Sequence, residues 1–247
     1  MKRVWITTII ILGFLSCVFG QEKIKPELLE VWEPVPEAVT PGKKVANDAP
    51  SDAIVLFDGT NFDEWESEVE AKDVKWKLEN GCMTVVDGAK GIQTKKKFGS
   101  IQLHIEWRSP AVVEGEGQGR GNSGIFFQKR YEVQVLDNFQ NKTYPNGQAG
   151  SVYKQHIPLV NACRKPGEWQ TYDIIFMEPE FNKDGIKVRS GYLTVFHNGV
   201  LVQNHVEIKG TTEYDMMPQN KAHGKGSIML QDHGNPVSYR NIWVREL

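Results

Sequence analysis

The chain has little of what marks several large classes of protein. No apolar run long enough to span a bilayer occurs after residue 20. The formal net charge is only -2, so the basic surface typical of nucleic-acid-binding proteins is missing. No cluster of cysteine and histidine has the spacing of a zinc site. For the body of the chain we therefore predict neither a transmembrane span nor binding to nucleic acid.

Cysteine is scarce as well, with 3 in 247 residues. One of them lies in the leader, which leaves Cys82 and Cys163 in the body. Two isolated cysteines in a chain of this size do not form a disulfide framework. We expect two buried free thiols, with a single disulfide as the alternative.

The leader comprises residues 1–20. Two basic residues precede an apolar run over 4–19, and small Gly20 is followed by polar residues. This pattern predicts a secretory signal peptide that is cleaved after Gly20. Residues 14–17 also resemble a bacterial lipobox, in which Cys17 would carry a lipid anchor. Either interpretation predicts an exported protein.

The remaining sequence divides into two parts. Residues 21–52 are proline-rich and poor in aliphatic residues, which is typical of an extended arm. Residues 53–247 contain many short segments of alternating polarity, separated by turn residues such as Asn198-Gly199. No long segment has the helical period of 3.6 residues. We predict one all-β domain, a sandwich of two antiparallel sheets.

Residues 131–138, Tyr-Glu-Val-Gln-Val-Leu-Asp-Asn, carry the strongest functional signal. Two valines alternate with Glu132 and Gln134, as in a strand with one buried and one polar face. A β-bulge just before Asp137 would turn that carboxylate onto the polar face, and bulges are frequent beside active sites. The three side chains would then serve acid–base chemistry on a sugar, although a solvated strand face has the same pattern.

The strand expected at residues 100–108 provides a second polar group. Glu106 and Arg108 would share one face, where the carboxylate can order the guanidinium, and a solvated face would look the same. Among the aromatic residues, Tyr153 and Trp169 are candidates for stacking on a sugar ring, with core packing as the alternative.

Two loops add further candidates. The glycine-rich residues 114–124 do not match a phosphate-binding loop and instead suggest a rim loop, with Asn122 and Ser123 available for sugar hydroxyls. Gln231 and His233 follow an apolar segment at a strand end. A histidine there can carry protons near neutral pH, although turn histidines are equally common.

Taken together and in order, these segments resemble the 3-keto-disaccharide hydrolase family. The resemblance covers about residues 53–247 and rests on Leu56–Gly59, Trp65, Glu106–Arg108, Gly121–Phe126, Tyr131–Asp137, Glu168-Trp169, His197–Gly199 and Leu230–Gly234. It implies a concanavalin A-like jelly-roll sandwich with a concave sugar-binding face. It also implies an exported protein of Bacteroidetes, periplasmic or associated with the outer membrane of a Gram-negative cell.

The resemblance extends distantly to glucanases of this fold, which carry Glu-x-Asp-x-x-Glu on a bulged strand. Glu132, Gln134 and Asp137 occupy the matching positions. The central aspartate has become glutamine, and the acid/base position holds a shorter side chain. Both departures put a retaining glycosidase mechanism in doubt, because it needs two carboxylates about 5–5.5 Å apart.

A 3-keto sugar offers another route, since the ketone acidifies the hydrogen on C2. One base removes that proton, the enolate expels the group on C1, and water adds back. For this route the hypothesis assigns Glu132 or His233 as the base and Asp137 as the acid, with Arg108 and Gln134 as orienting and charge-stabilising groups.

Two other functions remain open at this point: an ordinary glycoside hydrolase acting on glucans, and a carbohydrate-binding protein without catalysis. No cofactor is required by any motif. Folds of the concanavalin A type often hold a structural calcium ion, but no set of residues in the sequence identifies its ligands.

Overall fold

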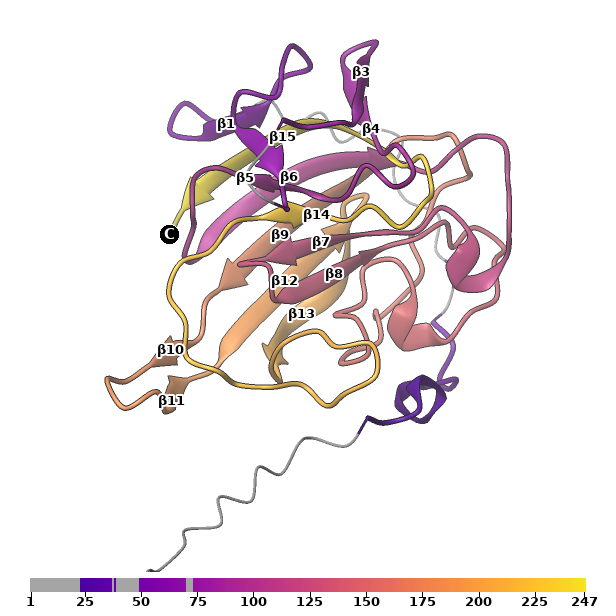
Figure 1. Ribbon diagram of the computed structural model, residues 1–247. Coiled ribbons are helices and arrows are strands. Elements are labelled where there is room, and N and C mark those ends of the chain that lie inside the picture. Colours follow the sequence, from indigo (N-terminus) through magenta and orange to yellow (C-terminus); the bar gives the residue numbers. More distant parts are fainter. Residues whose placement is uncertain (1–22, 37, 39–48, 70–72) are drawn as a thin grey trace, which may run out of the picture.

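The structure is a computed structural model that describes residues 23–36, 38, 49–69 and 73–247. Two antiparallel sheets pack face to face, as Figure 1 shows. Strands dominate, and the helices among the described residues are single 3₁₀ turns: η1 (Pro26–Leu29), η2 (Gly117–Gly119) and η3 (Pro145–Gly147). The molecule is a jelly-roll β-sandwich, which confirms the predicted fold class.

The larger sheet contains eight strands. Its main path runs β13 (Val200–Ile208), β12 (Gly191–His197), β9 (Gln170–Met177), β6 (Ile101–Arg108), β15 (Ser238–Glu246), β4 (Cys82–Thr84) and β3 (Lys77–Glu79). The eighth strand, β1 (Ile54–Phe57), also pairs with β15. Strand β15 therefore contacts three neighbours in one sheet.

The smaller sheet has five strands in the order β2 (Trp65–Ser67), β5 (Ile92–Thr94), β14 (Met229–Leu230), β7 (Ser123–Phe127) and β8 (Tyr131–Val135). A separate hairpin pairs β10 (Glu180–Phe181) with β11 (Lys187–Arg189). Most of the strands were anticipated from the sequence, whereas the short strands β2, β5, β10 and β11 were not.

The core lies between the two sheets. On β6 the apolar side chains that alternate toward the core are at most 1% exposed: Ile101, Leu103, Ile105 and Trp107. Phe127 of the smaller sheet stacks on Phe176 of the larger one, with ring centroids 4.8 Å apart. Burial of these apolar side chains, aliphatic and aromatic, is the main contribution that holds the sheets together.

The predicted Asn-Gly turns are present. Asn198 and Gly199 have φ values of 53° and 80°, and they connect β12 to β13. Asparagine and glycine tolerate this left-handed conformation better than other residues, which is why the pair predicts a tight hairpin.

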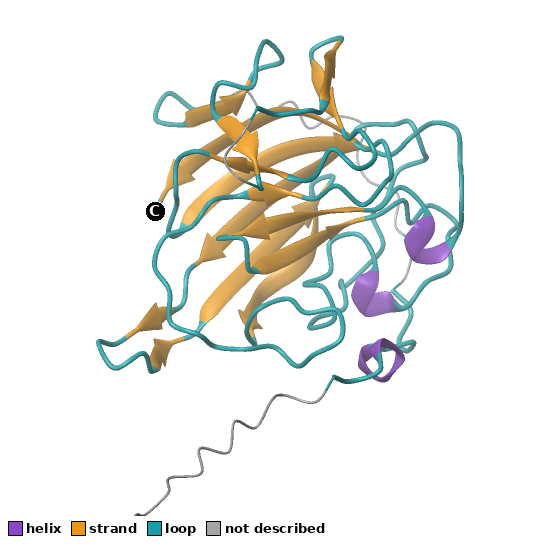
Figure 2. Ribbon diagram, in the orientation of Figure 1, coloured by secondary structure: helices purple, strands orange, loops and turns teal. Residues whose placement is uncertain are grey.

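The proline-rich arm is partly described and lies along the domain. Figure 2 shows its helix η1 near η2 and η3 at one end of the sandwich. Both cysteines of the body are free thiols, as predicted, with Cys82 buried and Cys163 half-buried. Residues 1–20, including Cys17, lie outside the described residues. Within the described part, no helix is both long and apolar enough to cross a membrane.

Candidate functional site

Three neighbouring strands of the smaller sheet build the floor of a polar pocket. On β7, Ile125 and Phe127 face the core, so Phe126 points to the opposite face of the sheet. Phe126 pairs with Glu132 on β8, and Gly124 pairs with Gln134. The main-chain N–H of Gln231, just beyond β14, donates to the carbonyl of Gly124 at 3.0 Å. This register places side chains from distant segments on one surface.

Loops surround this floor and enclose a pocket of about 570 Å³. The walls come from the arm, the glycine-rich loop, the segment after β8 and the long loop after β13. The lining residues are Glu30, Gln118, Asn122, Phe126, Glu132, Gln134, Tyr144, Tyr153, Thr212, Tyr214, Gln231 and His233. Of these described lining residues, none is lysine or arginine. Polar groups combined with aromatic rings are suited to sugars.

Glu132 is the carboxyl on the floor of the pocket whose pKa is moved close to neutrality. It is only 4% exposed, and burial raises the pKa of its carboxyl to about 8. Its main-chain N–H donates to the hydroxyl of Thr212 at 3.0 Å, which ties β8 to the long loop. A carboxyl with a pKa near neutrality is suited to proton transfer.

Gly124 makes room for this carboxyl. A Cβ atom at position 124 would lie 2.5 Å from Oε1 of Glu132 and 2.9 Å from the ring of Phe126. The carboxyl of Glu132 can occupy this position only because residue 124 has no side chain. The glycine serves close approach rather than unusual backbone geometry.

The pocket also presents unpaired hydrogen-bond acceptors. Nε2 of Gln134 donates to Oε1 of Gln118 at 3.0 Å, and Gln118 in turn donates to Gly147 O at 2.9 Å. The side-chain oxygens of Gln134 and Gln231 are buried without a hydrogen-bond partner. Buried acceptors of this kind are costly unless something pairs with them, and a sugar hydroxyl could do so.

Two tyrosines form one wall. The hydroxyls of Tyr144 and Tyr153 are 2.7 Å apart. Burial raises the pKa of Tyr144 to about 12 and that of Tyr153 further still, so both keep their protons near neutral pH. The predicted sugar-contacting aromatic Tyr153 thus lines the pocket, whereas Trp169 does not.

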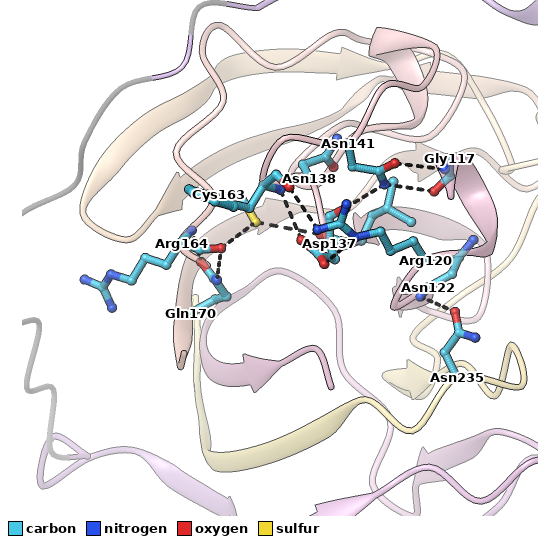
Figure 3. Close-up of polar contacts among 12 residues, drawn as sticks. Gly117, Arg120, Asn122, Asp137, Asn138, Asn141, Cys163, Arg164, Gln170 and Asn235 are labelled. Carbon is cyan, nitrogen blue, oxygen red and sulfur yellow. Dashed lines mark hydrogen bonds and ion pairs between the residues drawn. The ribbon is translucent and has the colours of Figure 1, made fainter. Parts of the chain in front are cut away.

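Asp137 is not in this pocket. The ladder between β7 and β8 is regular to Val135, where β8 ends, so no bulge turns the aspartate toward Glu132. As Figure 3 shows, Asp137 instead binds Arg120: Nε of Arg120 lies 2.7 Å from Oδ2. Oδ1 accepts from the N–H of Phe139 at 3.1 Å. The expected convergence of Asp137 and Glu132 is wrong.

The surroundings of Asp137 suggest a structural role. The main-chain N–H of Asp137 donates to the carbonyl of Arg120, and Nδ2 of Asn141 donates to the carbonyl of Asp137 at 2.7 Å. Asp137 is 2% exposed and lines a second, smaller pocket of about 200 Å³. Asp137 therefore fastens the glycine-rich loop to the segment after β8.

Arg108 and Glu106 also lie elsewhere, because they project from the face of β6 opposite the core. The guanidinium of Arg108 lies over the ring of Trp169, with its central carbon 4.6 Å from the ring centroid. Glu106 is 8% exposed and binds Nε of Arg240 at 2.6 Å. The expectation that these two residues contact substrate with Glu132 is not supported by their positions. This face of β6 is partly covered: Glu106 is buried, whereas the side chain of Arg240 is 43% exposed.

The two candidate residues of the glycine-rich loop, Asn122 and Ser123, lie in different surroundings. Asn122 lines the pocket, as expected of a rim residue. Ser123 is fully buried instead: its hydroxyl donates to the carbonyl of Gln231 at 2.6 Å and accepts from Tyr239 at 2.7 Å. Ser123 thus orders the floor without facing the pocket. His233 lies at the pocket margin with an exposed side chain.

Several lining residues were missed from the sequence: Glu30, Gln118, Phe126, Tyr144, Thr212 and Tyr214. Most lie on loops, where no periodicity marks an inward direction. Phe126 could have been found, since its position on β7 alternates with two buried apolar neighbours. Among the described residues, no group of three or more His, Cys, Asp or Glu is placed to hold a metal ion.

Residues 52–245 match the 3-keto-alpha-glucoside-1,2-lyase-like domain family. A 3-keto-disaccharide hydrolase of Bacteroides thetaiotaomicron is 29% identical over 250 residues, covering 78% of either chain.

Solved structures show the same fold. A Parabacteroides distasonis protein inferred to be a glycosyl hydrolase is 54% identical, with a TM-score of 0.80 over 90% of this chain and 96% of that one. A second protein from that organism, 21% identical, has a TM-score of 0.57 over 79% of this chain and 94% of its own. At that identity the likeness concerns the fold alone.

Proposed function

Since the chain belongs to the 3-keto-alpha-glucoside-1,2-lyase-like family, we propose that it cleaves the glycosidic bond of 3-keto-glycosides, including 3-keto-disaccharides, by elimination and hydration. The single observation that carries this proposal is Glu132, a buried carboxyl with a pKa of about 8 on the floor of a polar pocket. The name of the B. thetaiotaomicron relative gives the same substrate class.

The chemistry begins with proton removal. Glu132 in its ionised form takes the proton from C2, which the neighbouring ketone has acidified, and the electron pair forms the enolate. The enolate then forms the C1–C2 double bond and expels the oxygen on C1, which takes up a proton. Water adds to C1, and C2 regains a proton. The net change is hydrolysis, and it needs a base, a proton donor for the departing oxygen and a hydrogen-bond donor to the enolate oxygen.

The other pocket residues complete these steps. Gln134 and Gln231 present acceptors that orient the sugar hydroxyls. We assign His233 as the proton donor to the departing oxygen, because it lines the same pocket and Asp137 does not. The tyrosine pair keeps its protons and can hydrogen-bond to the oxygen that becomes negative.

Elimination and direct hydrolysis are separated by isotope labelling in D₂O. Elimination and hydration place solvent deuterium on C2 of the product, whereas direct displacement at C1 leaves that hydrogen in place. We expect deuterium on C2 above the level of an enzyme-free control. Glu132→Gln should lower turnover by roughly 10²–10⁴-fold, as expected for loss of a general base. Glu168→Gln, which changes an exposed carboxylate outside the pocket, is the control.

Two results would overturn the proposal. One is turnover of an unoxidised glucoside at the rate of its 3-keto form, which would indicate an ordinary glycoside hydrolase. The other is full activity of Glu132→Gln on 3-keto-glucosides.

We further propose that the protein is exported to the periplasm or outer membrane, as residues 1–20 suggest. Mass spectrometry of the mature N-terminus tests this proposal. Cleavage after Gly20 gives a chain that begins at Gln21. A lipoprotein begins at an acylated Cys17, and Cys17→Ser then abolishes labelling by radioactive palmitate.

A further inference from the structure

The N-terminal arm is bound to the loops that wall the pocket. The N–H of Val31 donates to Oδ1 of Asn146 at 3.0 Å, and Nδ2 of Asn146 donates to the carbonyl of Leu29 at 3.0 Å. Further toward the N-terminus, the N–H of Ile24 donates to the carbonyl of Asp215 at 2.9 Å. Asn146 thus binds the arm on both sides of Glu30.

Lys154 connects the same arm to the pocket wall. Its ammonium donates to the carbonyls of Pro26 at 3.2 Å and Tyr214 at 3.0 Å. It also lies over the rings of Tyr144, Tyr153 and Tyr214, at 5.6, 5.8 and 4.6 Å from their centroids. A cation held between rings and carbonyls couples the arm to three residues of the wall.

Glu30 is the part of the arm that reaches the pocket itself. It is half-buried and lines the pocket together with Glu132. None of the hydrogen bonds or ion pairs among the described residues engages its carboxylate. No lysine or arginine lines the pocket itself. The nearby cation is Lys154 in the wall: burial lowers the pKa of its ammonium, and the charge of Glu30 opposes that shift, so Lys154 offsets part of the charge of Glu30.

We propose that the docked arm is a wall of the sugar site, and that Glu30 selects neutral sugars against anionic ones such as uronates. This inference rests on the proposed function of the pocket. The unpaired carboxylate accepts hydrogen bonds from sugar hydroxyls and repels a ligand carboxylate. If the carboxylates of Glu30 and of a bound uronate lie about 8 Å apart at an effective dielectric constant of about 40, their repulsion lowers the affinity for the uronate by a factor of roughly five.

The test measures binding directly, so it does not depend on turnover. Isothermal calorimetry compares methyl glucoside with methyl glucuronide on the full-length protein, on Glu30→Gln and on Glu33→Gln. Glu33 is the matched control, because it lies on the same arm but is exposed and outside the pocket. We expect the wild type to favour the neutral sugar roughly fivefold, Glu30→Gln to bring the ratio close to one, and Glu33→Gln to keep it.

Hydrogen exchange tests the arm. Saturating methyl glucoside should slow exchange at residues 28–32 of the wild type, and Asn146→Ala should speed it and weaken sugar binding. The inference is overturned if Glu30→Gln leaves the ratio unchanged, or if the sugar leaves exchange in the arm unchanged. Failure of the proposed function looks different: the sugars bind with the expected ratio, but 3-keto-glucosides are not turned over.

Discussion

Glu132 should make the protein less stable than its amide variant, to an extent that depends on pH. Burial raises the pKa of this carboxyl from 4.5 to about 8. Below pH 4.5 the group is protonated in both the folded and unfolded states and has no effect. Between pH 4.5 and 8 it ionises only in the unfolded state, so the folded state loses relative stability as the pH rises.

The size of the effect follows from the shift. Each unit of pKa corresponds to about 1.4 kcal/mol, so the penalty is about 1 kcal/mol at pH 5, about 3 kcal/mol at pH 7 and about 5 kcal/mol at pH 9. Glu132→Gln removes this titration. The variant should therefore gain on the wild type by about 4 kcal/mol in unfolding free energy between pH 5 and pH 9.

Urea denaturation followed by fluorescence, at several pH values, measures this difference. Glu168→Gln provides the control, and its difference from the wild type should stay nearly constant across the range. A difference between Glu132→Gln and wild type that does not change with pH would refute the argument, whatever its absolute size. Activity of the wild type should rise with pH up to about 8, as the base becomes ionised.

Three more predictions concern neighbouring features. Gly124→Ala should lower turnover roughly 10- to 100-fold with an unchanged circular dichroism spectrum, because the added methyl displaces the carboxyl of Glu132. Asp137→Asn should cost about 3 kcal/mol in urea denaturation by breaking the buried pair with Arg120, and retained catalysis in the folded variant would confirm its structural role. Burial lowers the pKa of His104, but the carboxylates of Asp173 and Glu106 raise it more, to about 9. The charged imidazolium therefore stabilises the folded state fully below pH 6.5, and this stabilisation is lost as the pH rises through 9. His104→Gln should therefore differ most from the wild type at low pH in thermal melts, and an equal difference at pH 6 and pH 10 would contradict this.

The sequence predicted the sheets better than it predicted the site. Alternation on β6 and the Asn-Gly turns are local signals, and both correspond to the structure. The position of Asp137 depended on where β8 ends and on Arg120, 17 residues earlier in the chain, whose guanidinium binds it. Neither fact is encoded in a short pattern.

Alternation of polar and apolar residues also does not distinguish a solvent-exposed polar face of a sheet from a buried one. The polar face of β6 looked solvated, yet His104 is fully buried beneath the ring of Trp243, 139 positions further along, with centroids 5.2 Å apart. Loop residues such as Thr212 and Glu30 gave no periodic signal at all. Thr212 accepts from the main-chain N–H of Glu132, and the side chain of Asn146 binds the main chain on both sides of Glu30.

The place of β15 in the larger sheet constrains how the protein can be made. This strand follows all the others in the chain, yet it lies between β6 and β4 and also pairs with β1. Until the ribosome has added residues 238–246, strands β1, β4 and β6 lack β15, the neighbour that they share, and their edges stay unpaired. Closure must therefore wait until the domain is fully synthesised, which makes assembly dependent on distant contacts and correspondingly slow.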